Sequence, residues 1–329
     1  DTICWNFVKS FISFFIYFIL RLRNYKTFLQ IIYYLFIVAN KVTIIRKRAN
    51  NQQVTNDPDK VLAKKTLSEA LVGTSETLCV VSLNQKINTV DKEEQRFNEW
   101  LAGIIDGDGC LLVSKEGYCS CEITMDSFDY IALMQIKTKL GGSVKLRSGA
   151  AAYRYRLHHR AGMLALIHRI NGNIRNSKRL PQLKKVCDIL NVTFIEPIPL
   201  TLQNGWFSGF FDAAGTITAD FKRPSPIISI SVSNKYKQDV EDFLIFNGSL
   251  NYDKAGYGYY RWRIASESDI RNILMYFKQF PSRSQKLARI NKINQFFLLK
   301  TLKAHQATQE SNPALEKRWK TFQEKWFER

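Results

Sequence analysis

The apolar positions of residues 97–329 follow two spacings, the three-to-four-residue spacing of a helix and the two-residue alternation of a strand. These spacings predict the order α-β-β-α-β-β-α, and the whole order occurs twice. The predicted strands are residues 110–115, 118–125, 143–147 and 152–159, followed by 216–222, 226–232, 249–253 and 258–264. We therefore expect an α+β fold of two tandem, pseudo-symmetric repeats, each with a four-stranded antiparallel sheet.

The helices of this order are predicted from apolar residues that recur at every third or fourth position. The helix between the two hairpins is marked by Leu133, Ile136 and Leu140 in the first repeat and by Val240, Phe243 and Leu244 in the second. The closing helices are marked by Met163, Leu166, Ile167 and Ile170, by Leu183, Val186, Cys187 and Leu190, by Ile270, Ile273, Leu274 and Phe277, and by Ile290, Ile293 and Phe297. The tail carries Trp319, Phe322 and Trp326 at helical spacing, which predicts a docking helix rather than a binding site.

Direct repetition of residues supports the duplication. Four segments return in the same order, each 106 to 108 residues later. Residues 100–107 return as 206–213, 142–144 as 248–250, 153–157 as 260–264, and the pair Arg175 and Lys178 as Arg283 and Lys286. Internal repetition at domain spacing predicts a first repeat at residues 96–200 and a second repeat with a C-terminal helix at residues 201–329.

The residues before the repeats differ in composition. Residues 1–48 form an apolar and basic leader, in which the apolar runs 11–20 and 28–39 are each shorter than the ~20 residues that cross a bilayer. The two runs predict either a membrane-associated hairpin or targeting segment, or a translated leader without a fold of its own, and we favour the leader. Residues 49–95 predict a polar linker with one short helix near residues 61–71.

The composition limits the class of partner that the protein is expected to bind. The chain has 48 Lys and Arg against 29 Asp and Glu, a formal net charge of +19, which predicts a polyanionic partner, either nucleic acid or an anionic membrane surface. The six Cys show no disulfide or zinc spacing, so we expect reduced thiols in an intracellular compartment. Abundant Phe, Tyr, Ile, Asn and Lys and a first residue other than Met favour either an organellar reading frame that continues an upstream coding segment or a fragment.

Small residues gather in the segment that leads into the first strand of each repeat. Ala102 and Gly103 in the first copy, and Ser208 and Gly209 in the second, let two helix backbones approach closely. If the two helices pack together, their negative C-terminal ends lie side by side, and an acid placed there needs a divalent cation. Asp108 is such an acid, and its oxygen ligands suit Mg²⁺.

Residues 101–109, Leu-Ala-Gly-Ile-Ile-Asp-Gly-Asp-Gly, resemble the motif of the LAGLIDADG family of intron-encoded homing endonucleases and RNA maturases, and residues 207–215 match it less well. The resemblance covers about residues 97–329, in the single-chain form with two motifs. It implies that the motif helices form the interface between the repeats and that the two sheets form a saddle over a nucleic-acid duplex. It also implies that Asp108 binds the catalytic metal with the backbone carbonyl of Gly107 or Ala213.

The same resemblance implies a Lys from each repeat near the reacting phosphates, and the repeat match makes Lys178 and Lys286 the candidates. One position departs from the motif: Ala214 stands where the second acid is expected, and a methyl group cannot bind metal. We therefore expect double-strand cleavage to be lost or weakened. We expect Asp106 and Asp212, which occur in both copies, to make hydrogen bonds at the helix ends rather than to bind metal.

Basic residues alternate along the second hairpin of each repeat, and strand geometry places them on one face. They are Arg154, Arg156 and His158 in the first repeat, extended by Lys145 and Arg147, and Arg261 and Arg263 in the second, extended by Lys222 and Arg223. Their neighbours Tyr155, Leu157, Trp262 and Ile264 are expected to face the helices. A basic two-stranded ribbon fits the major groove of double-stranded DNA. We expect His158, His159 and His168 to be surface and hairpin side chains rather than a metal site.

Together these features predict a monomeric DNA endonuclease encoded by a mitochondrial intron, which cuts a long specific site with Mg²⁺. The alternative is an RNA maturase that binds its own group I intron RNA and assists splicing without cutting DNA. Asp108 favours the enzyme and Ala214 favours the maturase. A membrane-attached protein is a third reading that depends only on residues 1–48.

Overall fold

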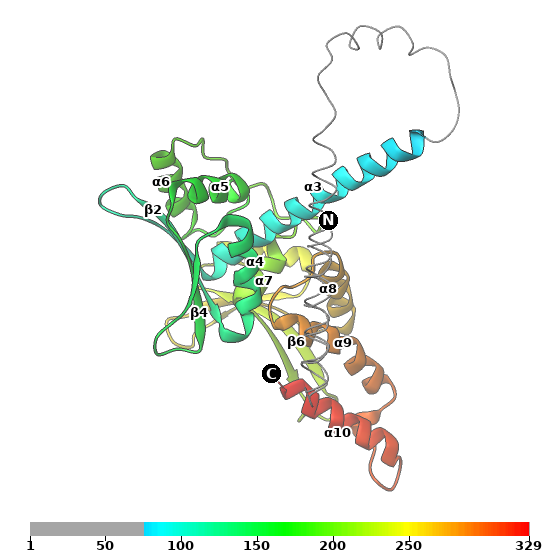
Figure 1. Cartoon of the computed structure of the whole chain (residues 1–329). Coiled ribbons are helices and arrows are strands. Elements are labelled where there is room, and N and C mark those ends of the chain that lie inside the picture. The colour runs from blue at the N-terminus through cyan, green and yellow to red at the C-terminus, as the bar shows by residue number, and fades with distance from the viewer. Residues whose placement is uncertain (1–75, 329) are drawn as a thin grey trace, which may run out of the picture. The chain divides into compact units, whose positions relative to one another are not determined.

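The computed structural model describes the backbone of residues 76–328 and the side chains of residues 91–328 (Figure 1). The predictions for the leader at 1–48 and for a short helix near 61–71 lie outside the described residues.

The described elements occur in two similar series, one for each repeat. The first contains α3 (Glu76–Asp108), β1 (Gly109–Val113), β2 (Cys119–Asp126), the 3₁₀ helix η2 (Ser127–Asp129), α4 (Tyr130–Leu140), β3 (Ser143–Leu146), β4 (Ala152–Leu157), α5 (Arg160–Ile170) and α6 (Leu180–Leu190). The second contains α7 (Trp206–Ala214), β5 (Gly215–Asp220), β6 (Ile227–Asn234), the 3₁₀ helices η3 (Lys237–Asp239) and η4 (Glu241–Phe246), β7 (Ser249–Asp253), β8 (Tyr259–Ile264), α8 (Glu267–Gln279), α9 (Lys286–Thr301), the 3₁₀ helix η5 (Ala304–Gln306) and α10 (Pro313–Phe327).

Each series forms a four-stranded antiparallel sheet, in the orders β1-β2-β4-β3 and β5-β6-β8-β7, which confirms the predicted fold class. The two-residue alternation decides what each face carries. On β4 and β8, Tyr155, Leu157, Trp262 and Ile264 are buried, as predicted. The Arg residues between them therefore lie on the opposite face of each sheet.

Helix α3 is longer at its N-terminal end than the sequence indicated. It begins at Glu76, so residues 76–95, which we expected to be linker, are helical instead. The polar composition suggested a loop, but residues 76–102 contain no Gly or Pro that would break a helix. The side chain of Glu94 on this helix accepts hydrogen bonds from Lys139 and Arg169, which attaches α3 to the first repeat.

The middle helix of the second repeat is not an α-helix, which corrects the prediction from Val240, Phe243 and Leu244. Residues 237–239 and 241–246 form two 3₁₀ helices instead, with Val240 between them. A 3₁₀ helix has three residues per turn, so residues three apart share a face. Val240, Phe243 and Phe246 have that spacing and are buried, whereas Leu244 is 46% exposed.

The C-terminal helix α10 packs through the three aromatic residues that mark it in the sequence. Trp319, Phe322 and Trp326 are buried, and their rings lie 5.6 to 6.2 Å from the ring of Phe221, which follows β5. None of the described helices combines the length and the apolar character that a membrane crossing requires.

Candidate functional site

The candidate site lies where the two motif helices, α3 and α7, pack against each other. A Cβ atom added to Gly103 would lie 2.1 Å from the backbone oxygen of Trp206, and one added to Gly209 would lie 1.9 Å from that of Trp100. Only glycine allows so close an approach of two helix backbones. Ala102 and Ser208, the other two residues predicted for this interface, are both buried.

Each motif helix donates a tryptophan hydrogen bond to the motif aspartate of the other repeat. The indole Nε1 of Trp100 donates to Asp212 Oδ2 at 2.9 Å, and that of Trp206 donates to Asp106 Oδ2 at 2.8 Å. The reciprocal pair joins the repeats across their pseudo-symmetry axis. In the sequence, each tryptophan stands six residues before the aspartate of its own repeat. This spacing does not show that each tryptophan bonds to the aspartate of the other repeat.

The two motif aspartates are anchored further by the loops that follow each repeat's first closing helix. Asp106 accepts from the backbone N–H of Arg175 at 2.8 Å, and Asp212 accepts from that of Arg283 at 2.7 Å. These contacts agree with the structural role that we expected for both. Desolvation of the fully buried Asp106 raises its pKa to about 7, although its hydrogen bonds and Arg179 act in the opposite direction.

Asp108 ends helix α3 directly before β1, and its side chain is exposed. Desolvation by the surrounding protein atoms raises its pKa, Lys286 acts against this rise, and Asp129 adds to it. Gly107 lies against the second motif, since a Cβ atom there would come within 2.3 Å of Ala213 Cβ. The predicted metal ligands Asp108, Gly107 and Ala213 are therefore brought together by the crossing of the helices.

The lysines that the repeat match paired, Lys286 and Lys178, occupy different environments. Lys286 Nζ points inward and donates to the backbone oxygens of Phe211, Asp212 and Ala213, at 2.8, 2.6 and 3.3 Å, which neutralises the negative end of α7. Lys178 is exposed. Arg179 makes the equivalent contact in the first repeat, since its Nε donates to the oxygen of Ile105 at 3.1 Å.

A cleft of about 800 Å³ opens beside Ala214, where the second motif acid is missing. It is lined from the first repeat by Asp106, Gly107 and residues 176–179, and from the second by Phe210, Ala214, residues 233–236, Gln238 and Asp239. Among the residues that the structure describes, no three His, Cys, Asp or Glu side chains gather in a way that would hold a metal ion by themselves.

The basic strand residues of the first repeat line a second cleft, of about 510 Å³, on the open face of its sheet. Its lining includes the predicted contacts Lys145, Arg147, Arg154 and Arg156, together with His158. Glu122 on β2 orients two of them, because it lies 2.6 Å from the guanidinium of Arg156 and 3.6 Å from that of Arg154. The predicted basic face of this repeat is therefore one continuous surface.

The second repeat carries fewer charges on its strands. Arg261 and Arg263 lie on β8, where Arg261 donates to the hydroxyl of Tyr259 at 2.5 Å. Lys222 and Arg223 lie in the loop between β5 and β6, and Arg223 pairs with Asp220 at 3.0 Å. These two residues extend the basic surface from a loop rather than from a strand.

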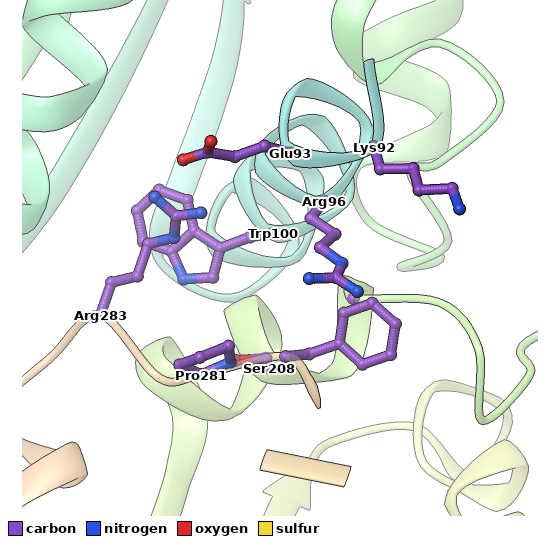
Figure 2. Close-up of a pocket in the computed structure, with 9 residues that line it drawn as sticks. Lys92, Glu93, Arg96, Trp100, Ser208, Pro281 and Arg283 are labelled. Atoms are coloured by element: carbon purple, nitrogen blue, oxygen red, sulfur yellow. The ribbon is translucent and has the colours of Figure 1, made fainter. Parts of the chain in front are cut away.

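A third cleft, of about 440 Å³, lies beside Trp100 of α3 and Ser208 of α7 (Figure 2). Lys92, Glu93 and Arg96 of α3 line it, and Figure 2 shows Arg283 lying beside Trp100. The guanidinium of Arg283 is 5.0 Å from the centre of that ring, and Arg175 lies at 5.4 Å from the ring of Trp206 in the same way. Each arginine thus stacks on the motif tryptophan of the other repeat.

No protein-family model matches the chain. Among curated proteins, it is 43% identical to the intron-encoded RNA maturase bI4 of Saccharomyces cerevisiae, over 85% of this chain and 47% of the relative. It is 33% identical to the intron-encoded DNA endonuclease ai2b of Dictyostelium discoideum, over 69% of this chain and 88% of the relative. A probable intron-encoded endonuclease, aI2, of Debaryomyces hansenii is 41% identical over 80% of this chain and 41% of its own length. The chain spans less than half the length of the maturase and of the Debaryomyces relative.

Solved structures have the same fold. The LAGLIDADG meganuclease I-AabMI bound to uncleaved DNA is similar with a TM-score of 0.50 and 19% identity, over 67% of this chain and 96% of that structure. I-SmaMI bound to an uncleaved DNA target in the presence of calcium ions is similar with a TM-score of 0.51 and 18% identity, over 68% of this chain and 97% of that structure.

The duplicated fold and the paired motif helices define a two-motif protein of the homing-endonuclease class. The chain belongs to the LAGLIDADG family of intron-encoded endonucleases and maturases. This membership confirms the resemblance that residues 101–109 indicated.

Proposed function

We propose that this chain is an intron-encoded endonuclease that binds a long specific site in double-stranded DNA and hydrolyses phosphodiester bonds there with a divalent metal, Mg²⁺. The packing of α3 against α7 carries the proposal, because it brings Asp108 beside Gly107 and Ala213 at the crossing of the two helices. The identity to endonucleases encoded by introns supports it. Since both motifs are in one chain, a monomer suffices, and the intron origin of the relatives supports a mitochondrial location.

The residues at the crossing fit a hard divalent cation, because they offer one exposed carboxylate and backbone oxygens. Bound there, the cation would act as a Lewis acid on the phosphate and lower the pKa of an attacking water. Asp108 would hold it together with the carbonyl of Gly107 or Ala213, and Lys286 Nζ donates to the Ala213 carbonyl at 3.3 Å. The basic cleft with Arg154 and Arg156 would bind the duplex backbone and read its groove.

Ala214 makes the two halves of this centre unequal. Cutting both strands requires hydrolysis of two phosphodiester bonds, and only the Asp108 half has a carboxylate that can bind metal at the end of its motif helix. We therefore propose that cleavage by this chain is weak or favours one strand.

A second function, that of an RNA maturase for its own group I intron, is supported by two observations. The relative at 43% identity is named as an RNA maturase. The third cleft gives the chain a surface of positive net charge beside Trp100, because Lys92, Arg96 and Arg283 outnumber Glu93 there. Such a surface would let RNA be bound without use of the metal site.

The test is incubation of the chain with Mg²⁺ and a duplex that joins the two exons flanking its intron, in parallel with a splicing assay of that intron. Nicking or cutting at one site in wild type, with loss of cutting but retention of binding in Asp108→Asn, supports the endonuclease. Asparagine keeps the size of the side chain and removes the charge that holds the metal. Stimulated splicing without any cleavage would reject the endonuclease in favour of the maturase.

A further inference from the structure

The two halves of the centre differ in charge by more than the missing acid. Strand register makes the positions equivalent: Ile123 pairs with Tyr155 on β2 and β4, as Val232 pairs with Trp262 on β6 and β8. Counting three residues onward from Ile123 and from Val232, Asp126 at the end of β2 corresponds to Lys235, the residue directly after β6. Asp108 corresponds to Ala214, since each ends its motif helix directly before a strand.

The two lysines of the Ala214 cleft, Lys178 and Lys235, are exposed and can contact a ligand. Arg179 makes the inward contact with Ile105 that Lys286 makes in the other repeat, and this leaves Lys178 exposed at the cleft. Lys235 is also exposed at its wall. Within the described part of the chain, none of Lys178, Arg179 and Lys235 forms an ion pair.

Both carboxylates that line this cleft, Asp239 and Asp106, already accept hydrogen bonds from the protein. Asp239 accepts from Ser177 with both oxygens, at 2.8 Å from the backbone N–H and at 2.9 Å from the hydroxyl. Asp106 is buried: its Oδ2 accepts from Arg175 and Trp206, and its Oδ1, which has no hydrogen-bond partner, is shielded from solvent by the surrounding protein. A metal ion entering the cleft would meet three cationic side chains and no exposed carboxylate, so the local charge opposes it.

We propose that the cleft beside Ala214 is a phosphate site that needs no metal, in which Lys178, Lys235 and Arg179 hold one backbone phosphate of the bound duplex. The cleft, of about 800 Å³, has room for such a group. Charge-assisted hydrogen bonds from ammonium and guanidinium groups replace the cation that Asp108 binds on the other strand. This inference rests on the proposed binding of a duplex, and it gives the half that has lost its acid a role in holding the strand.

The test measures affinity in EDTA for the exon-junction duplex, with a single neutral methylphosphonate placed in turn at central positions of each strand. In wild type, neutralising the phosphate in this cleft should weaken binding roughly tenfold, whereas no position on the other strand should do so, because Asp108 and Asp126 repel its phosphate. In Lys178→Ala/Lys235→Ala, binding should be weaker and the methylphosphonate should have no further effect, since its partners are absent.

Two variants control for folding and for net charge. Lys178→Arg/Lys235→Arg should keep the sensitivity to the methylphosphonate. Lys185→Ala/Lys278→Ala removes the same charge from exposed positions on α6 and α8 and should also keep it. Duplex binding that shows no position-specific sensitivity, or that shows it equally in Lys178→Ala/Lys235→Ala, would overturn the metal-free site alone. Sensitivity to the methylphosphonate that appears only when Ca²⁺ is added would also overturn the metal-free site. Failure of wild type to bind any duplex would overturn the proposed function and this site with it.

Discussion

The substitution Gly209→Ala tests the helix crossing most directly. The new Cβ would lie 1.9 Å from the backbone oxygen of Trp100, whereas an ordinary contact is 3.4 Å or more, so the helices must separate locally by about 1.5 Å. The indole hydrogen bonds of Trp100 and Trp206, at 2.9 and 2.8 Å, span the same interface and would be stretched beyond hydrogen-bond range.

The expected loss of stability follows from these two effects. Overpacking costs about 1–3 kcal/mol, and each buried carboxylate that loses a donor costs about 1–3 kcal/mol more. Replacing glycine by alanine in a helix contributes roughly 1 kcal/mol in the opposite direction. Taking the middle of each range for overpacking and for the two carboxylates, we expect a net loss of about 5 kcal/mol, which lowers Tm by roughly 10–20 °C in a domain of this size.

Thermal unfolding followed by circular dichroism measures the effect, with Gly117→Ala as the control. Gly117 has φ +84° and no heavy atom within 4 Å of an added Cβ, so only backbone strain, of roughly 1 kcal/mol, is expected there. Gly103→Ala/Gly209→Ala should cost less than the sum of the single variants, because one separation accommodates both methyl groups. A Tm for Gly209→Ala equal to or above that of wild type would refute the close crossing.

Three further outcomes are expected. Trp206→Phe removes the only side-chain donor to Asp106 among the described residues and should lower the free energy of unfolding by about 1–3 kcal/mol in a urea titration; an unchanged midpoint would contradict the exchange of indole hydrogen bonds. Arg154→Glu/Arg156→Glu should weaken duplex binding, and wild-type affinity should fall steeply with salt by counterion release, whereas an affinity independent of salt in an anisotropy titration would reject the basic surface. Ala214→Asp should increase double-strand cleavage relative to nicking and make it depend more on Mg²⁺, as read on a gel; a wild type that already cuts both strands equally, and is unchanged by the added acid, would show that another ligand replaces this position.

Much of the fold could be predicted because it depends on local spacing. The alternation along residues 152–159 and 258–264 requires Tyr155 and Trp262 to face the core, and both are fully buried. The repeat match likewise identified equivalent positions in the two halves. The spacing left one local question open: Val240, Phe243 and Leu244 fit an α-helix, and only the additional burial of Phe246 shows the three-residue turn.

The candidate site was predicted less completely, because its contacts join residues about 70 to 110 positions apart. Neither motif reveals that Trp100 bonds to Asp212 and Trp206 to Asp106, since each tryptophan crosses to the other repeat. The pairing of Lys178 with Lys286 was sound as a match of positions, but packing turned Lys286 inward and left Lys178 outside.

By itself, the sequence determined the duplication, the strand faces, the motif with Asp108 and the loss of its partner at Ala214, because each is a property of residue type and spacing along one segment. Tertiary structure alone decided the crossed hydrogen bonds and the different charge of the two halves of the centre. The physical reason is that these depend on which backbone groups two distant segments bring within about 3 Å of each other. Gly103 and Gly209 allow the two helix backbones to approach, and the packing of the whole interface determines which groups contact each other there.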